Sequence, residues 1–234
     1  MKQKIIIIFT SILPPHIGGP ATFCSKLINE VINEKENILY VCSPSSRYNY
    51  TKIIKANKEN KFLPIGENIN PLKRIYKIIK LAFKFRKKEF IVFSNTLDME
   101  ASIFSLITRS QHIIKVVGDL AWERYKDKGG RLNFEEYNNQ FVNLLNFGRK
   151  AYRNFPLFFA RKIIVPSIFL HGYVNKIFPI NKQNLTILYN SVDYQKANKE
   201  IYSLAKKKFS FINDDFFLRK IFKINTSNNN KNNY

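Results

Sequence analysis

Short apolar runs of strand length alternate with longer amphipathic stretches along most of this 234-residue chain. The run from Ile5 to Phe9 is a continuous β-branched and hydrophobic segment, as expected for a parallel strand covered on both faces. Further candidate strands lie at 38–42, 61–64, 90–93, 112–117, 162–165 and 185–188, and helix-like patterns lie at 21–33, 72–88, 98–108, 133–147 and 167–178. This alternation predicts an α/β fold: a single Rossmann-like, doubly wound parallel sheet with right-handed crossovers.

Two of the expected helices begin with a local capping signal. Asn133 can cap the helix that follows it, and Glu136 stands three residues later, where its side chain can reach back. Ser167 follows Val165-Pro166 and can cap the last expected helix.

The composition is strongly basic. Lys and Arg number 39 against 17 Asp and Glu, which gives a net charge of +22. Such a surface suits an anionic partner, namely a nucleic acid, an anionic lipid or a phosphorylated substrate. The abundance of Lys, Asn, Ile, Phe and Tyr also matches what AT-rich codons encode, so compositional bias explains part of the charge equally well. With 45% apolar residues, the chain can bury a sizeable core.

The two cysteines and the first residues indicate a cytoplasmic protein. Cys24 and Cys42 lie beside apolar runs and are expected to be buried thiols in a reducing compartment. The start of the chain imitates a secretion signal, but Pro14-Pro15 interrupts the apolar run and no small-residue cleavage site follows. No apolar run approaches the roughly 18 residues that a membrane-spanning helix needs.

A glycine-containing turn joins the first strand to the first helix. In a doubly wound sheet this loop lies at the carboxyl ends of the strands, where ligands bind. Gly18 and Gly19 have no side chain, so an anion can approach their N–H groups and the helix N-terminus. A tight turn without a ligand explains the same residues. The turn matches neither a dinucleotide fingerprint nor a Walker P-loop.

Four segments in order along the chain resemble glycosyltransferase family 4. They are Pro14-Pro15-His16-Ile17-Gly18-Gly19, the segment from Ile114 to Arg124 that reads IKVVGDLAWER, the turn from Ala160 to Ser167, and the hinge-like Leu188-Tyr189-Asn190-Ser191-Val192-Asp193. The second is similar to a "KIVGDYAWE" strand and loop of one branch of that family. The resemblance covers residues 1 to about 193, so residues 1–193 are expected to form the N-terminal, acceptor-side domain.

The resemblance implies a GT-B enzyme with two Rossmann-like domains that transfers a sugar from a nucleoside diphosphate sugar, with retention, in polysaccharide biosynthesis. By motif position, Gly18 and Gly19 would approach the donor diphosphate, while His16, Trp122 and Glu123 would line the acceptor side. Asp119 would be the catalytic carboxylate, able to orient a sugar hydroxyl or accept its proton. The alternative is that Asp119 caps a turn and Trp122 fills core. Many relatives carry a histidine near Gly118, and this chain does not.

The chain has 234 residues, whereas two domains of the usual size need about 300 to 400. Residues 194–224 resemble a hinge and the start of the donor-binding domain, and residues 225–234 form an Asn-rich tail that is expected to be disordered. We therefore expect this truncated polypeptide to be inactive alone, because the donor-binding half stabilises the leaving group. A second polypeptide carrying that half is one expected partner, as is a glycan or lipid-linked acceptor. No metal and no resident cofactor are expected.

The stretch 72–88 is a basic amphipathic helix. Lys73, Lys77, Lys80 and Lys84 share one side and are candidates to face an anionic membrane on the cytosolic side. An ordinary crossover helix with a solvated lysine face explains the same pattern. The competing function class is a non-enzymatic basic domain that binds an anionic membrane or nucleic acid. Since no helix-turn-helix, zinc or RNP-type signature is present, no nucleic-acid partner is expected.

Overall fold

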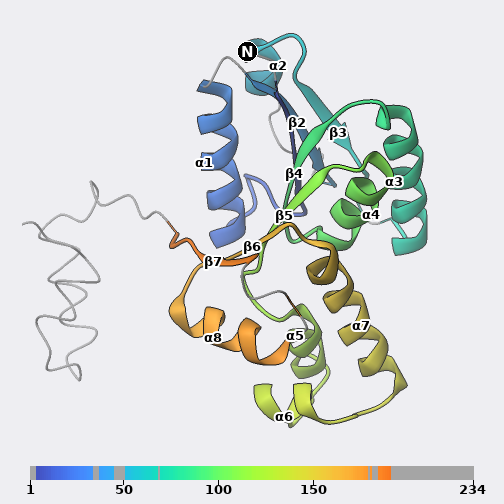
Figure 1. The fold of residues 1–234 in the computed structure, drawn as a ribbon, viewed down its shortest axis with the longest axis vertical. Helices are drawn as coiled ribbons and strands as arrows, with labels where there is room; N and C mark the ends of the chain where they lie inside the picture. The colour runs from blue at the N-terminus through green and yellow to red at the C-terminus, as the bar shows by residue number, and fades with distance from the viewer. Residues whose placement is uncertain are drawn as a thin grey trace, which may run out of the picture. The chain divides into compact units, whose positions relative to one another are not determined.

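The computed structural model describes residues 4–33, 37–44, 51–67, 69–178, 180 and 184–190 (Figure 1). One compact unit ends at Asn190. The expected hinge at 194–224, the Asn-rich tail at 225–234 and the end of the 1–193 domain after Asn190 lie outside the described residues.

The described strands form one seven-stranded sheet in the order β3-β2-β1-β4-β5-β6-β7, and every neighbouring pair is parallel. Their bounds are β1 Lys4–Thr10, β2 Asn37–Ser43, β3 Lys61–Pro64, β4 Phe90–Asn95, β5 Gln111–Lys115, β6 Lys162–Val165 and β7 Leu185–Ile187. Each expected strand is present, so the predicted Rossmann-like α/β fold is confirmed. From β1 the chain adds strands β2 and β3 on one side, and it then crosses to the other side of β1 to add β4 to β7. Folds of this class bind ligands at the point between β1 and β4 where the strand order changes direction.

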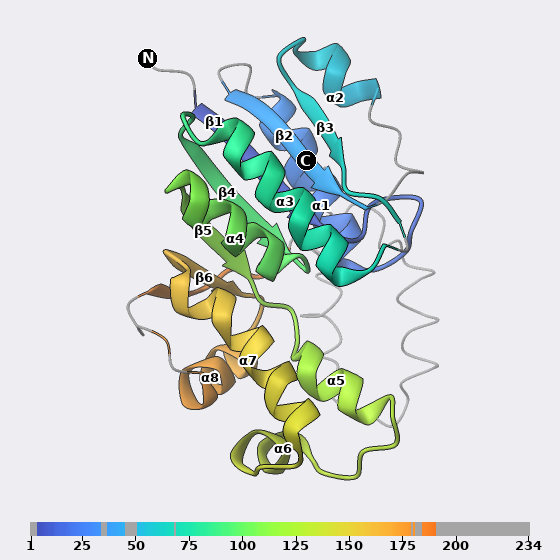
Figure 2. The same ribbon diagram turned by 90° about the vertical axis from the view of Figure 1, so that its right-hand side faces the viewer.

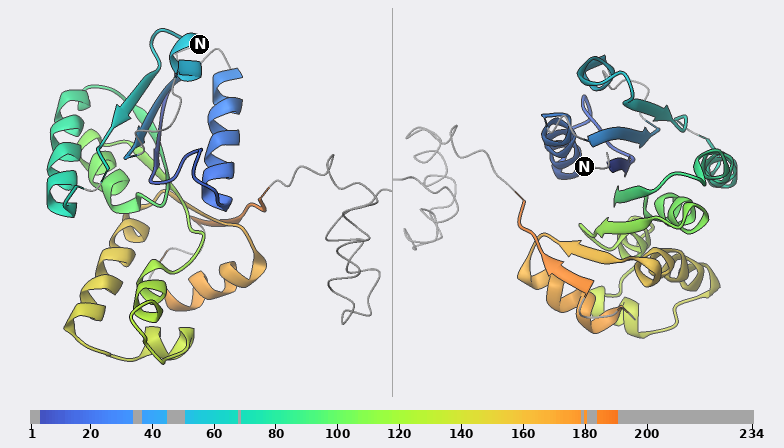
Figure 3. Two further views of the ribbon diagram at one scale, coloured as in Figure 1. Left: turned by 180° about the vertical axis from the view of Figure 1, so that it is seen from behind. Right: turned by 45° about the horizontal axis from the view of Figure 1, so that its top comes forward.

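Helices cover both faces of the sheet. Their bounds are α1 Gly19–Asn33, α2 Thr51–Ala56, α3 Pro71–Phe85, α4 Asp98–Thr108, α5 Leu120–Lys126, α6 Phe134–Asn139, α7 Leu144–Phe159 and α8 Ile168–Ile177. Helix α1 lies behind the sheet in Figure 2, whereas α3, α4 and α7 lie in front of it. Helices α5 and α6 lie beyond the carboxyl ends of the strands (Figure 3).

The side chains of β1 alternate between the two hydrophobic cores, because successive residues of a strand point to opposite faces. Ile7 and Phe9 pack with α3 and α4, in a cluster that includes Ile78 and Phe104. Ile8 packs on the other face with Ile28 of α1. Both faces of β1 are therefore buried, which explains its unbroken apolar sequence.

The expected helix at 133–147 is wrong, because two helices occupy this region. Asn133 and Glu136 form the capping box that the sequence indicates, but α6 ends at Asn139 and Gln140 is extended. Asn143 then caps a new helix by accepting a hydrogen bond from the N–H of Asn146 at 2.9 Å. The second cap, rather than the apolar periodicity, determines where α7 begins.

Two other local expectations, on Ser167 and on the cysteines, are confirmed. Ser167 caps α8 by accepting from the N–H of Leu170 at 3.1 Å. Cys24 and Cys42 are both buried free thiols. None of the described helices is long and apolar enough to cross a membrane.

Candidate functional site

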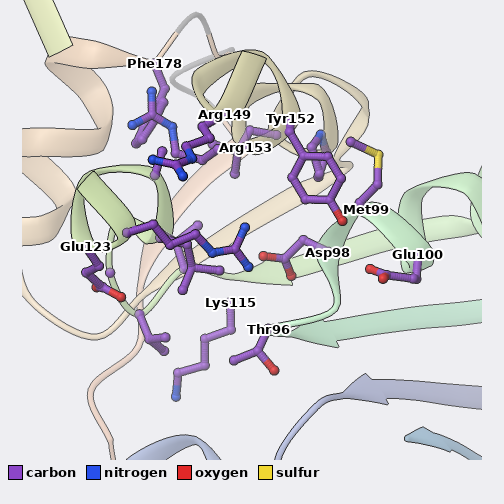
Figure 4. Close-up of a pocket in the computed structure, with 18 of the residues that line it drawn as sticks. Thr96, Asp98, Met99, Glu100, Lys115, Glu123, Arg149, Tyr152, Arg153 and Phe178 are labelled. Atoms are coloured by element: carbon purple, nitrogen blue, oxygen red, sulfur yellow. The ribbon is translucent and has the colours of Figure 1, made fainter. Parts of the chain in front are cut away.

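A cavity of ≈ 120 Å³ opens at the carboxyl ends of β4 and β5 (Figure 4). Its walls come from the β4–α4 and β5–α5 connections and from α7, with Arg74 contributed by α3. Five cationic and three acidic side chains line it: Arg74, Lys115, Arg124, Arg149 and Arg153, with Asp98, Glu100 and Glu123. The cavity can therefore accept an anionic group together with a hydrogen-bonding one.

Asp98 begins α4 and points into this cavity (Figure 4). The Ser94 hydroxyl donates a 2.6 Å hydrogen bond to Oδ1 of Asp98. Burial raises the pKa of Asp98 to about 6, with a smaller contribution from the Glu100 charge, against the Ser94 hydrogen bond that lowers it. A carboxyl group with a pKa near neutrality suits proton transfer to or from a sugar hydroxyl.

A buried polar chain continues behind Asp98. Ser94 Oγ also lies 3.0 Å from Nε2 of His112, and Nδ1 of His112 lies 3.2 Å from Oγ of Ser102. Burial lowers the pKa of His112 to about 3, so its ring is neutral at physiological pH. The neutral ring fixes the Ser94 hydroxyl, and Ser94 in turn fixes the Asp98 carboxyl.

Thr96, in the loop between β4 and α4, has a strained backbone. Its φ of 86° lies in the left-handed region, which a β-branched residue rarely adopts. The Thr96 hydroxyl accepts a hydrogen bond from the N–H of Ser11 at 3.0 Å and lies 2.6 Å from the Ser11 hydroxyl. These bonds tie the loop after β4 to the loop after β1, and Thr96 also lines the cavity. Such strain is found at functional sites more often than elsewhere.

Lys115 ends β5 and is almost fully buried, with 1% of its surface exposed. Its ammonium group donates to Oδ1 of Asn190 at 2.6 Å and lies 3.1 Å from the ring centroid of Phe23 in α1. Burial lowers the pKa of Lys115 to about 8. Burying a lysine ammonium group is costly when its neighbours are an amide and an aromatic ring rather than a carboxylate. Buried lysines with a lowered pKa are typical of functional sites.

Asp119 is buried and its carboxylate is saturated with hydrogen bonds. Oδ1 accepts from the N–H groups of Ala121 and Trp122 at 3.0 and 3.1 Å, so Asp119 caps α5. Oδ2 accepts from Tyr173 at 2.8 Å, from Asn138 at 3.2 Å and from the Arg153 guanidinium.

These partners keep Asp119 ionised. Burial alone would raise the pKa of Asp119, but the Arg153 charge and the hydrogen bonds outweigh it and hold the pKa below its ordinary value. Residues from α6, α7 and α8 meet at this carboxylate. The geometry thus matches the capping alternative, and the catalytic role of Asp119 stays a prediction.

Trp122 and Glu123 lie on α5 with different surroundings. The indole N–H of Trp122 donates to the carbonyl oxygen of Leu132 at 3.4 Å, and its ring meets Phe134 edge-on at 5.2 Å. Trp122 is partly buried against Leu132 and Phe134. Of the described residues that line the cavity, Trp122 is not one. Glu123 does line it, and burial together with Asp119 and Asp127 raises its pKa.

The glycine turn lies at the same end of the sheet, at the N-terminus of α1. Asn95 at the end of β4 donates to the carbonyl oxygen of Pro20 at 3.5 Å and to Sγ of Cys24 at 3.3 Å. Gly18 has a φ of 151°, and a Cβ built on Gly19 would meet no atom within 4 Å. The backbone at Gly18-Gly19 is therefore open to a ligand. His16 is exposed.

Several residues of the cavity were missed from the sequence, namely Thr96, Asp98, Lys115, Arg149 and Arg153. A signal existed for Asp98, because it follows the expected strand at 90–93 and begins an expected helix. A polar residue at that point of a parallel sheet is a ligand-site candidate. Lys115 stands inside the quoted 114–124 segment, but nothing local distinguishes a buried lysine from a surface one.

No protein-family model matches this chain, and no curated protein matches its sequence. Several solved structures are similar in fold, among them the following two. The Anabaena protein HepE in complex with UDP-glucose matches with a TM-score of 0.52 and 13% identity, covering 90% of this chain and 50% of HepE. A glycosyltransferase from Rickettsia africae matches with a TM-score of 0.53 and 12% identity, covering 90% of this chain and 50% of the other. The chain thus spans about half the length of structures it matches, and its fold is similar to one half of GT-B glycosyltransferases.

Proposed function

We propose that this chain is the acceptor-side domain of a retaining, family 4-like glycosyltransferase. The observation that carries the proposal is the cavity at the carboxyl ends of β4 and β5, in a sheet similar to half of a GT-B enzyme. The donor is a nucleoside diphosphate sugar, a proposal supported by the UDP-glucose named with HepE. The acceptor is a glycan or a lipid-linked sugar.

In this proposal Asp98 receives the acceptor hydroxyl. Its carboxyl has a pKa of about 6 and faces the cavity. The two oxygens of Asp119 already accept from five donors, so Asp119 serves as a positioning residue that holds α5 and Glu123 against the cavity. Lys115 and Arg149 supply positive charge for a phosphate of the acceptor or donor.

Gly18 and Gly19 approach the donor diphosphate, because they lie at the start of α1 and a Cβ built on Gly19 would meet no atom within 4 Å. His16 and Trp122 border the acceptor in this proposal. Sugar transfer also requires a donor-binding half beyond the residues that form this sheet, supplied by a further segment or a second polypeptide.

A chimera tests the proposal directly. Residues 1–193 would be joined to the donor-binding half of HepE and incubated with UDP-glucose and a panel of glycan and lipid-linked acceptors. We expect transfer by the chimera, none by the 234-residue chain alone, and a loss of about 100-fold in the chimera carrying Asp98→Asn. Robust turnover by the chain alone would refute the need for a donor half. An Asp98→Asn chimera as active as its parent would remove the assigned role of Asp98.

A further inference from the structure

Helix α7 carries its apolar residues on the outside. Leu144, Phe147, Phe155, Phe158 and Phe159 are all exposed, with Leu144 at 79%, Phe158 at 69% and Phe147 at 58%. At about 100° per residue these positions share one side of the helix. We call Leu144, Phe147, Phe155, Phe158 and Phe159 the α7 stripe. A helix on the surface of a soluble domain normally shows the opposite pattern.

The charged residues of α7 point inward and are engaged. Arg153 contacts Asp119, and Arg149 donates to Oδ1 of Asn146 at 3.2 Å. Lys150 donates to the carbonyl oxygen of Gln140 at 2.8 Å and lies 4.6 Å from the ring centroid of Tyr137. These contacts orient the helix, so the outward position of the phenylalanines is a fixed feature of the fold.

The α7 stripe is too long to be incidental. Single exposed apolar residues are common, but a contiguous patch marks an interaction site. A helix of 16 residues is roughly 24 Å long, and the stripe runs from its first residue to its last. Exposed Phe141 extends it beyond the N-terminus of α7 and lies 6.4 Å from Phe147 between ring centroids.

A basic surface lies in the same helical layer. Helices α3 and α7 both pack against α4, as Figure 2 shows. Lys73, Lys80 and Lys84 are exposed on α3, beside the exposed side chains of Tyr76 and Phe83. Neither α3 nor α7 contains an Asp or Glu. The outer sides of α3 and α7 therefore combine exposed aromatic side chains with exposed lysines.

We propose that the outer face of α3, α4 and α7 docks on an anionic lipid bilayer. The phenylalanines of the α7 stripe enter the boundary between headgroups and acyl chains, and the α3 lysines contact lipid phosphates. A second copy of the chain fits less well, because pairing this face with itself would oppose two lysine surfaces on molecules of net charge +22. The docking surface goes beyond the proposed function and does not depend on sugar transfer.

The same helix connects this surface to the cavity. Arg149, Tyr152 and Arg153 of α7 line the cavity, while Phe155 and Phe158 face outward. A bilayer bound to the stripe would therefore lie within one helix diameter, about 10 Å, of the cavity wall. The proposal favours a lipid-linked acceptor over a soluble glycan.

Co-sedimentation with vesicles tests the docking surface. The purified chain would be titrated with phosphatidylcholine vesicles and with phosphatidylcholine–phosphatidylglycerol vesicles, at low and high salt. We expect salt-sensitive binding to the anionic vesicles only. The double variant F147S/F158S should bind them about tenfold more weakly, because two aromatic side chains no longer enter the bilayer. The matched control is I168S/F169S, which removes two exposed apolar side chains from α8 and should bind as wild type does.

A second measurement keeps the test independent of how the serine variants fold. Phe158→Trp should show a blue-shifted emission and quenching by brominated lipids in anionic vesicles, whereas Phe169→Trp should show neither. Equal binding by F147S/F158S and wild type, or no quenching of Phe158→Trp, would overturn the proposal. The proposal would also be overturned if wild type formed a dimer that the F147S/F158S substitutions dissociate. The same holds if the donor half of the chimera abolished vesicle binding. In either case the α7 stripe would be a protein interface.

Discussion

Oγ of Ser94 lies 2.6 Å from Oδ1 of Asp98 and 3.0 Å from Nε2 of His112. Asp98 faces the cavity, whereas Ser94 and His112 are buried behind it. The carboxyl group is thus held by a neutral polar chain and has no cation bonded to it among the described residues. This environment accounts for its raised pKa and for the role that we propose.

Replacing Asp98 by Asn should stabilise the chain at neutral pH. The pKa of Asp98 is about 6 in the folded chain against an ordinary value of 3.8. The folded state therefore binds more protons than the unfolded state between these values, so stability falls as pH rises through this interval. Asp98→Asn removes this cost and should raise the free energy of unfolding at pH 7 by about 1 to 3 kcal/mol, with little change near pH 4.

Urea denaturation at the two pH values would measure the Asp98 effect, with Asp127→Asn as the control at an exposed carboxylate. An Asp98→Asn variant that is less stable than wild type at pH 7 would show that the carboxylate is ionised without penalty.

Replacing Asp119 by Asn should have the opposite effect. The change removes the charge that compensates Arg153, whose side chain is 11% exposed. Breaking a buried pair of this kind costs about 3 to 5 kcal/mol, whereas Asn can still cap α5. We expect the free energy of unfolding to fall by about 3 kcal/mol in thermal or urea denaturation. Unchanged stability would mean that Asp119 is not the centre of this polar network.

Lys115 should make the chain more stable at alkaline pH. Its pKa is about 8 in the folded chain against 10.5 ordinarily. The unfolded chain retains the proton between these values while the folded chain releases it, so stability should rise with pH through this interval. The variant Lys115→Met should lack this rise. Parallel pH profiles of wild type and Lys115→Met, measured by denaturation, would contradict the assignment.

The two glycines of the turn should respond differently to alanine. Gly18 has a φ of 151°, so Gly18→Ala should destabilise the chain by about 1 kcal/mol. A Cβ at Gly19 meets no atom within 4 Å, so Gly19→Ala should leave stability within about 0.5 kcal/mol of wild type. Any loss of sugar transfer by the Gly19→Ala chimera would then report on ligand approach. A strongly destabilised Gly19→Ala variant would show that the turn is packed rather than open.

The sequence predicted the sheet well because the signal for each strand is local. Ile5 to Phe9 is apolar throughout since both faces of β1 are covered, and such a run needs no knowledge of its neighbours. The burial of a polar side chain by residues that are distant in sequence could not be predicted in this way. Lys115 is buried only because Phe23 of α1 and Asn190 meet it there, and these residues are distant in sequence.

The prediction at Asp119 shows the same limit on a smaller scale. The motif position suggested a catalytic carboxylate, and the alternative was that Asp119 caps a turn while Trp122 fills core. Only the packing of α6, α7 and α8 around the carboxylate, through Asn138, Arg153 and Tyr173, distinguishes the two.

The central claim is that the cavity at the carboxyl ends of β4 and β5 receives a phosphate-bearing acceptor. It can be tested on the chain itself by titrating ¹⁵N-labelled protein with a water-soluble, short-chain lipid diphosphate sugar. We expect the largest amide shifts around Thr96, Asp98 and Lys115, and binding about tenfold weaker in Lys115→Met. Shifts confined to the separate hollow lined by Phe141, Lys150 and Asn154, or no shifts at all, would contradict the claim.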